Sequence, residues 1–558
     1  MLKKYPPQYF EVRKLKTTFR SITDILLTNK TYAERMLVKT YAGAVHGIES
    51  TTITVEVSAG GLPPQNEDKK IPTFYFLVGL PDSAVKEGWQ RIEAALINSK
   101  FGMPRMKLVV NLAPADLRKE GAAYDLPIAI SVYAAANGLV FNDLENFIIV
   151  GELSLDGSVR PIKGALPMAI QARYEKFKGI ILPKANAREA AIVSGIEVYG
   201  IENLREAIEF FDGTRQLERV VVDTRAEFAA QNSIYDVDFS DVRGQENIKR
   251  ALEIAAAGGH NAILIGPPGA GKTMLSRRLP TILPPLNLHE ALETTKIHSV
   301  AGILPPEASL VAKRPFRSPH HTISDVALVG GGSTPMPGEI SLAHNGVLFL
   351  DELPEFKRTV LEVMRQPMEE RRVTISRAKL TIDYPASFML IASMNPCPCG
   401  YYNHPEKPCV CGFGVVKRYL SKISGPLLDR IDLHVEVVPV KLEELTSVNH
   451  QSETSVEIAA RVVRARDIQD ARFINHKGVY SNAHMPSRLV REVCNLDTEG
   501  LELLKTAMAR LQLSARAYDR ILKVARTVAD LAECEHIKPE HLAEAIQFRS
   551  LDRANWAG

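Results

Sequence analysis

The sequence predicts a multidomain α/β protein, with an α/β domain, then a domain built on a parallel sheet, then an all-α domain. Three observations carry this prediction. Short strands alternate with helices up to about residue 213. Continuous apolar strands at 261–265 and 346–350 lead into glycine-rich or acidic segments, as buried strands of a parallel sheet do. Beyond residue 440, apolar residues recur at helical spacing.

The composition indicates a globular protein of the cytoplasm. Hydrophobic residues make up 45% of the 558, charged residues 24%, and the net charge is +3. So small an excess neither requires nor excludes a nucleic-acid partner. No apolar run reaches the ~18 residues of a membrane helix, and the N-terminus does not resemble a secretory signal. The six cysteines fit a reducing cytosol, so we expect a cytoplasmic protein without membrane segments.

The N-terminal third contains a basic extension followed by the α/β domain. Residues 1–35 are polar and weakly periodic, which predicts a loosely ordered extension and makes Met36 a plausible alternative start. The domain spans 36–213, and a charged linker at 214–234 follows it. Within the domain we expect strands at 53–57, 74–78 and 107–112 and helices at 85–99 and 127–138. We also expect a hairpin whose strands, 148–153 and 159–162, flank Asp156-Gly157.

A phosphate-binding loop opens the chemistry of the central domain, 235–440. It matches G-x-x-x-x-G-K-[ST] and consists of Gly266, Pro267, Pro268, Gly269, Ala270, Gly271, Lys272 and Thr273. An apolar strand precedes it and a helix follows it, which is the context that a chance match lacks. Its backbone N–H groups would surround the phosphates, Lys272 would reach the β- and γ-phosphates, and Thr273 would hold Mg²⁺. The loop predicts ATP and Mg²⁺ as cofactors.

Two carboxylates end the apolar strand 346–350. Asp351 would bind Mg²⁺, and Glu352 would polarise the attacking water. Such a pair is often a solvated turn. Because a phosphate loop precedes it in the same domain, the catalytic interpretation is favoured.

Further segments resemble AAA+ ATPases, and that resemblance implies roles for five more residues. Val242 and Gly244 would contact the adenine, and Asn395, after the strand 389–394, would be sensor 1. Arg430 would enter a neighbouring subunit's site as an arginine finger, and Arg516 would be sensor 2. A finger acting between subunits implies a homo-hexameric ring. The alternative for Arg430 is a surface ion pair with an adjacent aspartate, Asp429 or Asp432.

The N-terminal domain resembles the Lon protease domain, an S5-like α/β fold, through its segment 151–162. The resemblance places Ala123 at the position of the nucleophilic serine and Leu166 at that of the catalytic lysine. A Ser–Lys protease needs both groups. We therefore expect a non-catalytic scaffold, with Ser154 and Lys163 as a remote possibility of a displaced dyad.

The segments 316–324 and 337–346, with an alternating hairpin at 370–382, resemble the magnesium-chelatase ATPases. The whole order from Met36 onward resembles the ComM/YifB family of that clade. The resemblance implies a hexameric DNA translocase or branch-migration helicase acting in natural transformation. A rival function is a chelatase-type motor that remodels a protein or assists metal insertion into a tetrapyrrole.

Positive charge on the predicted hairpin offers a DNA contact. The basic residues are Arg371, Arg372, Arg377 and Lys379. In a ring this hairpin could track DNA phosphates, giving salt-sensitive binding that is independent of base sequence. A solvated hairpin whose charges prevent aggregation is the alternative.

Four of the six cysteines cluster after Asn395. They are Cys397, Cys399, Cys409 and Cys411, which could bind structural Zn²⁺, with His404 as an alternative ligand. Free thiols are the other interpretation. His320 and His321 could also suggest a metal site, but one adjacent pair is a weak signal, so a structural role is favoured.

The C-terminal domain, 441–558, is predicted to be a helical lid. Its helices are expected at 456–471, 486–494, 501–511, 517–532 and 539–548.

Overall fold

The computed structural model describes residues 37–60, 75–104, 106–231, 235–305, 308–332, 334–377, 380–404, 406–439 and 452–549. The predicted extension 1–35 and Lys379 lie outside these ranges. The chain divides into two compact units. The first comprises Met1–Thr224 with Ser299–Ser309, and the second comprises Arg225–His298 with Leu310–Gly558.

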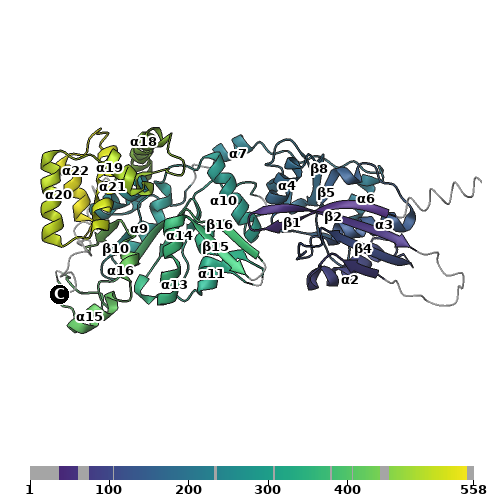
Figure 1. The fold of residues 1–558 in the computed structure, drawn as a ribbon, viewed down its shortest axis with the longest axis horizontal. Coiled ribbons are helices and arrows are strands. Elements are labelled where there is room, and N and C mark those ends of the chain that lie inside the picture. Colours follow the sequence, from purple (N-terminus) through teal and green to yellow (C-terminus); the bar gives the residue numbers. More distant parts are fainter. Residues whose placement is uncertain are drawn as a thin grey trace, which may run out of the picture. The chain divides into compact units, whose positions relative to one another are not determined.

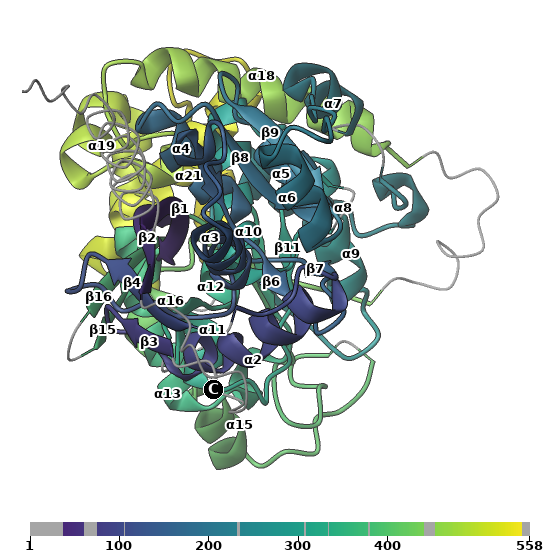
Figure 2. The same cartoon turned by 90° about the vertical axis from the view of Figure 1, so that its right-hand side faces the viewer.

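The first unit is built on a seven-stranded mixed sheet with strand order β3-β4-β2-β1-β5-β8-β9 (Figures 1 and 2). Its strands are β1 (Leu37–His46), β2 (Glu49–Gly60), β3 (Tyr75–Val78), β4 (Lys107–Ala113), β5 (Phe147–Ile149), β8 (Gly179–Pro183) and β9 (Glu197–Ile201). A separate hairpin pairs β6 (Glu152–Leu153) with β7 (Val159–Arg160). Its helices are α2 (Ser83–Asn98), α3 (Asp125–Asn137), α4 (Ala165–Tyr174), α5 (Lys184–Ala190) and α6 (Leu204–Phe211).

Helices cover both faces of this sheet. On β1, Thr40 Oγ1 is hydrogen-bonded to Ser131 Oγ of α3 at 3.0 Å. Gly43 lies against α4, where a Cβ would come within 2.7 Å of Met168. Because residues an odd number apart on a strand point to opposite faces, α3 and α4 lie on opposite sides of the sheet.

The second unit contains a five-stranded, wholly parallel sheet with order β11-β14-β17-β10-β18. Its strands are β10 (Ala262–Ile265), β11 (Phe316–Arg317), β14 (Val347–Leu350), β17 (Met389–Met394) and β18 (Leu433–Glu436). The three central strands are buried along their length, which explains their unbroken apolar sequences. Because all strands are parallel, their carboxyl ends share one edge of the sheet, where ligands bind in open α/β folds.

Shorter elements surround this sheet. The strands are β12 (Gly330–Gly331), β13 (Met336–Pro337), β15 (Arg372–Arg377) and β16 (Leu380–Pro385). The helices are α8 (Glu246–Gly258), α9 (Lys272–Arg278), α10 (Leu288–Ala301), α11 (Asp325–Val329), α12 (Glu339–Leu342), α13 (Arg358–Val363), α14 (Arg365–Glu370), α15 (Phe413–Leu420) and α16 (Gly425–Leu428).

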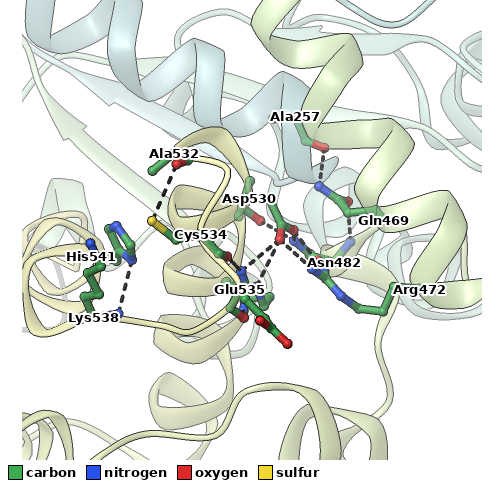
Figure 3. Close-up of polar contacts among 12 residues, drawn as sticks. Ala257, Gln469, Arg472, Asn482, Asp530, Ala532, Cys534, Glu535, Lys538 and His541 are labelled. Atoms are coloured by element: carbon green, nitrogen blue, oxygen red, sulfur yellow. Dashed lines mark hydrogen bonds and ion pairs between the residues drawn. The ribbon is translucent and has the colours of Figure 1, made fainter.

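The C-terminal helices form one hydrophobic core with α8 and the sheet. They are α18 (Ser455–Phe473), α19 (Ser487–Val493), α20 (Thr498–Leu511), α21 (Ala515–Leu531) and α22 (Pro539–Gln547). A buried polar cluster joins them. Figure 3 shows Asp530 receiving hydrogen bonds from Arg472 and Asn482, and Gln469 donating to the carbonyl of Ala257 in α8.

The structure confirms the predicted α/β class with its parallel sheet and C-terminal helices. The linker 214–234 contains helix α7 (Thr224–Gln231). One expectation needs correction. The strand expected through 148–153 is two strands, β5 and β6, which belong to different sheets. A single apolar run does not reveal such a change of partner.

Candidate active site

Backbone geometry makes the phosphate loop depend on its glycines. Gly269 and Gly271 have φ of +76° and +83°, which side chains of L-residues rarely allow. Gly266 instead is required by close packing, since a Cβ there would lie 2.6 Å from both the Cβ and the carbonyl oxygen of Val437. The loop therefore joins the buried β10 to α9 without side chains in its path.

Lys272 is a buried cation surrounded by neutral acceptors. Its Nζ donates to the carbonyls of Gly266 (2.7 Å) and Pro267 (2.9 Å) and to Asn395 Oδ1 (3.2 Å). No described carboxylate forms an ion pair with it. Burial lowers the pKa of Lys272, and Asp351 and Glu352 oppose that shift from a distance. Such an uncompensated charge fits an anionic ligand.

Asp351 connects the loop to the sheet. Its Oδ2 accepts from Thr273 Oγ1 at 2.8 Å, and its Oδ1 accepts from Ser393 Oγ. The parallel pairing of Leu350 with Ala392 brings the ends of β14 and β17 together and so positions Ser393. Ser393 was not predicted, because only the pairing of these two strands reveals it. The Thr273 hydroxyl and the Asp351 carboxylate are oxygen ligands of the kind that Mg²⁺ prefers, and they lie close enough to bind one ion.

Glu352 and Asn395 follow the same two strand ends. Glu352 has a left-handed backbone (φ +54°) and its side chain is exposed. Its Oε2 lies 3.7 Å from His321 Nδ1, a contact that the sequence analysis missed because one adjacent histidine pair is a weak signal. Asn395, through Lys272, belongs to the same cluster. The structure thus brings Lys272, Thr273, Asp351 and Asn395 together, with Glu352 beside them.

The residues expected to contact adenine lie in the segment that precedes helix α8. Val242 is buried, and its carbonyl accepts from Ser452 Oγ at 3.1 Å. Gly244 has a φ of +65°. The next residue, Gln245, reaches the phosphate loop itself, since its Nε2 donates to the carbonyl of Ala270 at 3.4 Å.

Arg430 does not contact this cluster within the described chain. Its side chain is largely buried, donates to the carbonyl of Pro426, and forms an ion pair with Glu369 of α14. The partner is thus neither of the adjacent aspartates considered as the alternative.

Those aspartates are held by the helix α21 instead. Arg516 Nη1 lies 2.9 Å from Asp429 Oδ2, and Arg520 Nη1 lies 2.8 Å from Asp432 Oδ1. Arg516 and Arg520 are four residues apart and so share one face of α21. The candidate sensor 2, Arg516, is therefore tied to the segment that carries Arg430 rather than to the phosphate loop.

The predicted basic hairpin is the antiparallel pair β15–β16. One face is buried through Val373, Ile375 and Tyr384, whose hydroxyl donates to the carbonyl of Pro335 at 2.8 Å. Arg372 and Arg377 are exposed. Arg372 Nε donates to Glu370 at 3.3 Å, a contact that solvent screens.

Arg371 differs from the two exposed arginines. Its Nη1 donates to the carbonyl of Gly478 at 2.8 Å, and burial lowers its pKa. A DNA contact by Arg371 would require this bond to break.

The four clustered cysteines lie together in the loop between β17 and α15. Cys397 is buried and the other three are half-buried. Their sulfurs all lie within 4.8 Å of one another. Among the described residues, these four cysteines form a cluster of side chains that could hold a metal ion. His404 is outside this group, because its Nδ1 accepts from the amides of Glu406 and Lys407.

Comparison with known proteins agrees with this geometry. Sequence profiles for magnesium chelatase subunit ChlI match residues 65–186 and 238–445, and one for the C-terminal part of that subunit matches 452–549. "Competence protein ComM" of Haemophilus influenzae is 41% identical over 524 residues, covering 92% of this chain and 97% of that protein. The chain belongs to the ComM/YifB family of magnesium-chelatase-like AAA+ proteins.

Other relatives include a second member of the family and a magnesium-chelatase subunit. "Uncharacterized protein YifB" of Escherichia coli is 43% identical over 515 residues, 91% of this chain and 96% of that protein. The "Magnesium-chelatase 38 kDa subunit" of Rhodobacter capsulatus is 26% identical over 252 residues, 42% of this chain and 61% of its own. Membership of this AAA+ family suggests an ATPase that uses ATP and Mg²⁺. Among the described helices, none has the length and apolarity to cross a membrane.

The first unit contains the residues that the Lon resemblance places at, or near, the positions of a Ser–Lys dyad. Leu166 is buried, and its backbone N–H donates to Glu189 at 3.0 Å. Ser154 Oγ accepts from Arg160 Nε at 2.7 Å. No described contact joins Ser154 to Lys163, so the geometry offers no displaced dyad among the described residues.

Proposed function

We propose that this protein is an ATP-hydrolysing motor that forms a homo-hexameric ring and drives DNA translocation or branch migration in recombination or natural transformation. The convergence of Lys272, Thr273, Asp351 and Asn395 at one sheet edge carries the ATPase part. Parallel α/β sheets bind nucleotides at such an edge.

The chain's own groups divide the work at this site. Lys272 would exchange its carbonyl partners for phosphate oxygens, which compensate its charge better. Glu352 would polarise the attacking water, and Asn395 would orient it. Thr273 and Asp351 would hold Mg²⁺. When bound, that ion would offset the negative charge that develops on the phosphate oxygens.

Arg430 would complete the site of a neighbouring subunit. In that role its guanidinium stabilises the charge of the transferring phosphoryl group. To reach a neighbour it must leave Glu369, so that ion pair would hold the unassembled state. Lack of any described contact between Arg430 and its own phosphate loop fits a site shared between chains.

The β15–β16 hairpin would contact DNA through Arg372 and Arg377. Its exposed face also carries the hydroxyls of Thr374 and Ser376, and hydroxyl and guanidinium groups are common phosphate ligands. Lys379 would add a further charge. The Haemophilus relative is named a competence protein, which supports a role in natural transformation.

Steady-state ATP hydrolysis by the full-length protein tests this proposal. We expect single-stranded or branched DNA to stimulate hydrolysis, and the stimulation to fall as salt rises. Glu352→Gln should retain ATP binding and lose turnover. The double variant Arg372→Ala/Arg377→Ala should keep the basal rate and lose stimulation, while Arg488→Ala, an exposed arginine of α19, serves as the matched control.

Two outcomes would overturn parts of the proposal. An assembled ring whose ATP hydrolysis is unaffected by any DNA at low salt would exclude the DNA motor. In that case the rival function, remodelling of a protein or assistance to metal insertion, would be favoured by the likeness to the Rhodobacter chelatase subunit. Full turnover in Glu352→Gln would show that the catalytic site is misassigned.

A further inference from the structure

We propose that Cys397, Cys399, Cys409 and Cys411 bind one Zn²⁺ ion, which fixes the loop after Asn395 against the phosphate loop. The metal site stands on its own observations. Its effect on turnover rests on the ATPase proposed above.

The spacing of the sulfurs fits a single tetrahedral ion. Cys397 Sγ lies 3.3 Å from Cys399 Sγ and 3.7 Å from Cys409 Sγ, and Cys399 Sγ lies 3.6 Å from Cys409 Sγ. Tetrahedral zinc with Zn–S bonds of about 2.3 Å places its sulfurs about 3.8 Å apart. A disulfide needs about 2.05 Å, and all four cysteines are free. An iron–sulfur cluster, with several metal atoms inside, holds its thiolates further apart.

The chemistry of the ligand set points the same way. Four thiolates in a tetrahedral arrangement select zinc or an iron–sulfur cluster among biological metals. Four thiols this close would otherwise gain little from their proximity, since their sulfurs are weak donors and acceptors. One Zn²⁺ ion would join two Cys-x-Cys segments that are ten residues apart and close the loop between them.

One side of the metal loop packs on the phosphate loop. Gly400 follows Cys399, and its N–H donates to the carbonyl of Cys397 at 3.0 Å. Its φ is +85°, and a Cβ there would lie 2.6 Å from Pro268 Cδ. A turn at Gly400 thus allows the metal loop to touch the phosphate loop directly.

The other end of the loop returns to the candidate catalytic residues. Helix α15 begins two residues after Cys411, and the hydroxyl of its buried Tyr419 interacts with the backbone N–H of Asn395. Just beyond α15, Lys422 Nζ lies 3.4 Å from Glu355, in the turn that follows Glu352. Closing the cysteine loop therefore restrains Asn395 from both sides of the chain, and Asn395 in turn contacts Lys272.

Metal analysis of the purified full-length protein tests the site. We expect about one zinc ion per chain after purification with thiols kept reduced, and its loss in Cys409→Ser/Cys411→Ser. His404→Ala and Cys534→Ser should keep the ion, because neither residue belongs to the cluster. Iron instead of zinc, a metal-free wild type after zinc is supplied, or zinc retained by the double variant would each overturn the proposal.

Hydrogen exchange tests, without relying on activity, whether the metal positions the loop after Asn395. A strong chelator removes zinc from the wild-type protein, so the test does not depend on correct folding of the double variant. Zinc removal should speed amide exchange at 395–412 and in the phosphate loop, and zinc addition should reverse it. In the active enzyme, kcat should fall on the order of tenfold to a hundredfold. Unchanged exchange in both loops would overturn the positioning role, whereas a wild type that exchanges as expected but hydrolyses no ATP would overturn only the proposed function.

Discussion

Two buried charges of the second unit have opposite surroundings. Asp530 is 1% exposed and receives hydrogen bonds from Arg472 (2.9 Å), Asn482 (2.7 Å) and Arg526 (3.0 Å). Lys272 is 8% exposed and contacts only neutral oxygens. The first charge is compensated within the fold, so it stabilises the helical core. The second has no carboxylate partner among the described residues. The comparison teaches that Lys272 is distinguished by two features together, its lack of a carboxylate partner among the described residues and its place in the phosphate loop.

The largest effect should come from removing the uncompensated charge. Lys272→Met should abolish ATP turnover, because the phosphates lose their cation, yet leave the unfolding free energy unchanged or higher. Lys523→Met is the matched control. Lys523 is also 8% exposed, burial lowers its pKa to about 8, and it lies in α21 away from the phosphate loop. Steady-state kinetics and urea denaturation measure both quantities.

That contrast can fail in a clear way. If Lys272→Met unfolds far more easily than wild type, Lys272 is a structural residue and the comparison is wrong. If Lys523→Met loses turnover as fully as Lys272→Met, the loss does not report on phosphate binding.

Arg430 extends the comparison to a charge that would change partners. It is paired with Glu369 within the chain, whereas the proposed ring needs it in a neighbour's site. Arg430→Ala should lower turnover about a thousandfold. Mixing inactive Lys272→Met chains with inactive Arg430→Ala chains should restore activity, because some interfaces then combine an intact Lys272 with an intact Arg430.

No recovery on mixing, in rings shown to contain both chains, would mean that the site is not shared. Glu369→Gln gives the complementary measurement. It should free Arg430 without removing it and leave turnover of the assembled ring at least as high as wild type.

The compensated charge should show the reverse behaviour of Lys272. Asp530→Ala leaves Arg472 and Arg526 buried together, and should lower the unfolding free energy by about 3–5 kcal/mol. Glu533→Ala is the control, since its ion pair with Arg464 is more than half exposed and should contribute about 1 kcal/mol or less. Urea denaturation followed by circular dichroism gives both values. Equal losses in the two variants would remove the distinction between compensated and exposed pairs.

The elements and site residues that could be predicted from the sequence are those marked by a pattern of neighbouring residues. The five C-terminal helices lie within about three residues of their expected ends, since apolar spacing is a local property. The phosphate loop and the Asp351–Glu352 pair were recognisable for the same reason. β1 was not predicted, because Ala42, Gly43 and Ala44 favour no strand, and its pairing with β2 and β5 decides its conformation.

Partners that are distant in sequence could not be predicted. Ser393 meets Asp351 only because β14 and β17 pair in one register. The alternative to an arginine finger was an ion pair of Arg430 with Asp429 or Asp432. Helix α21 provides arginines for both aspartates, and the partner of Arg430 is Glu369. The sequence shows which charges exist, and the fold decides which of them remain uncompensated.

Asp125 in the first unit is intermediate between Lys272 and Asp530 in how far its charge is compensated. Of the stability changes, the one that depends on Asp125 should be the smallest. It is 1% exposed and has one arginine partner, Arg91, at 2.6 Å. Desolvation outweighs Arg91 and raises the pKa of Asp125 from 3.8 to about 6. A folded-state pKa above the unfolded value means that the folded form binds the proton more tightly. Its stabilising contribution is therefore complete below about pH 4 and is lost as the pH rises through about 6, by on the order of 3 kcal/mol.

The prediction is measured as a difference between wild type and Asp125→Asn, which cancels the other groups that titrate in this range. Trp89 of α2 reports unfolding of the first unit in a Trp556→Phe background, because the sequence contains two tryptophans. The unfolding free energy of wild type should fall relative to Asp125→Asn between about pH 4 and pH 6. A difference that stays constant would show that Arg91 compensates Asp125 fully. One arginine would then suffice where Asp530 has two, and a single missing partner would no longer distinguish a charge reserved for a ligand.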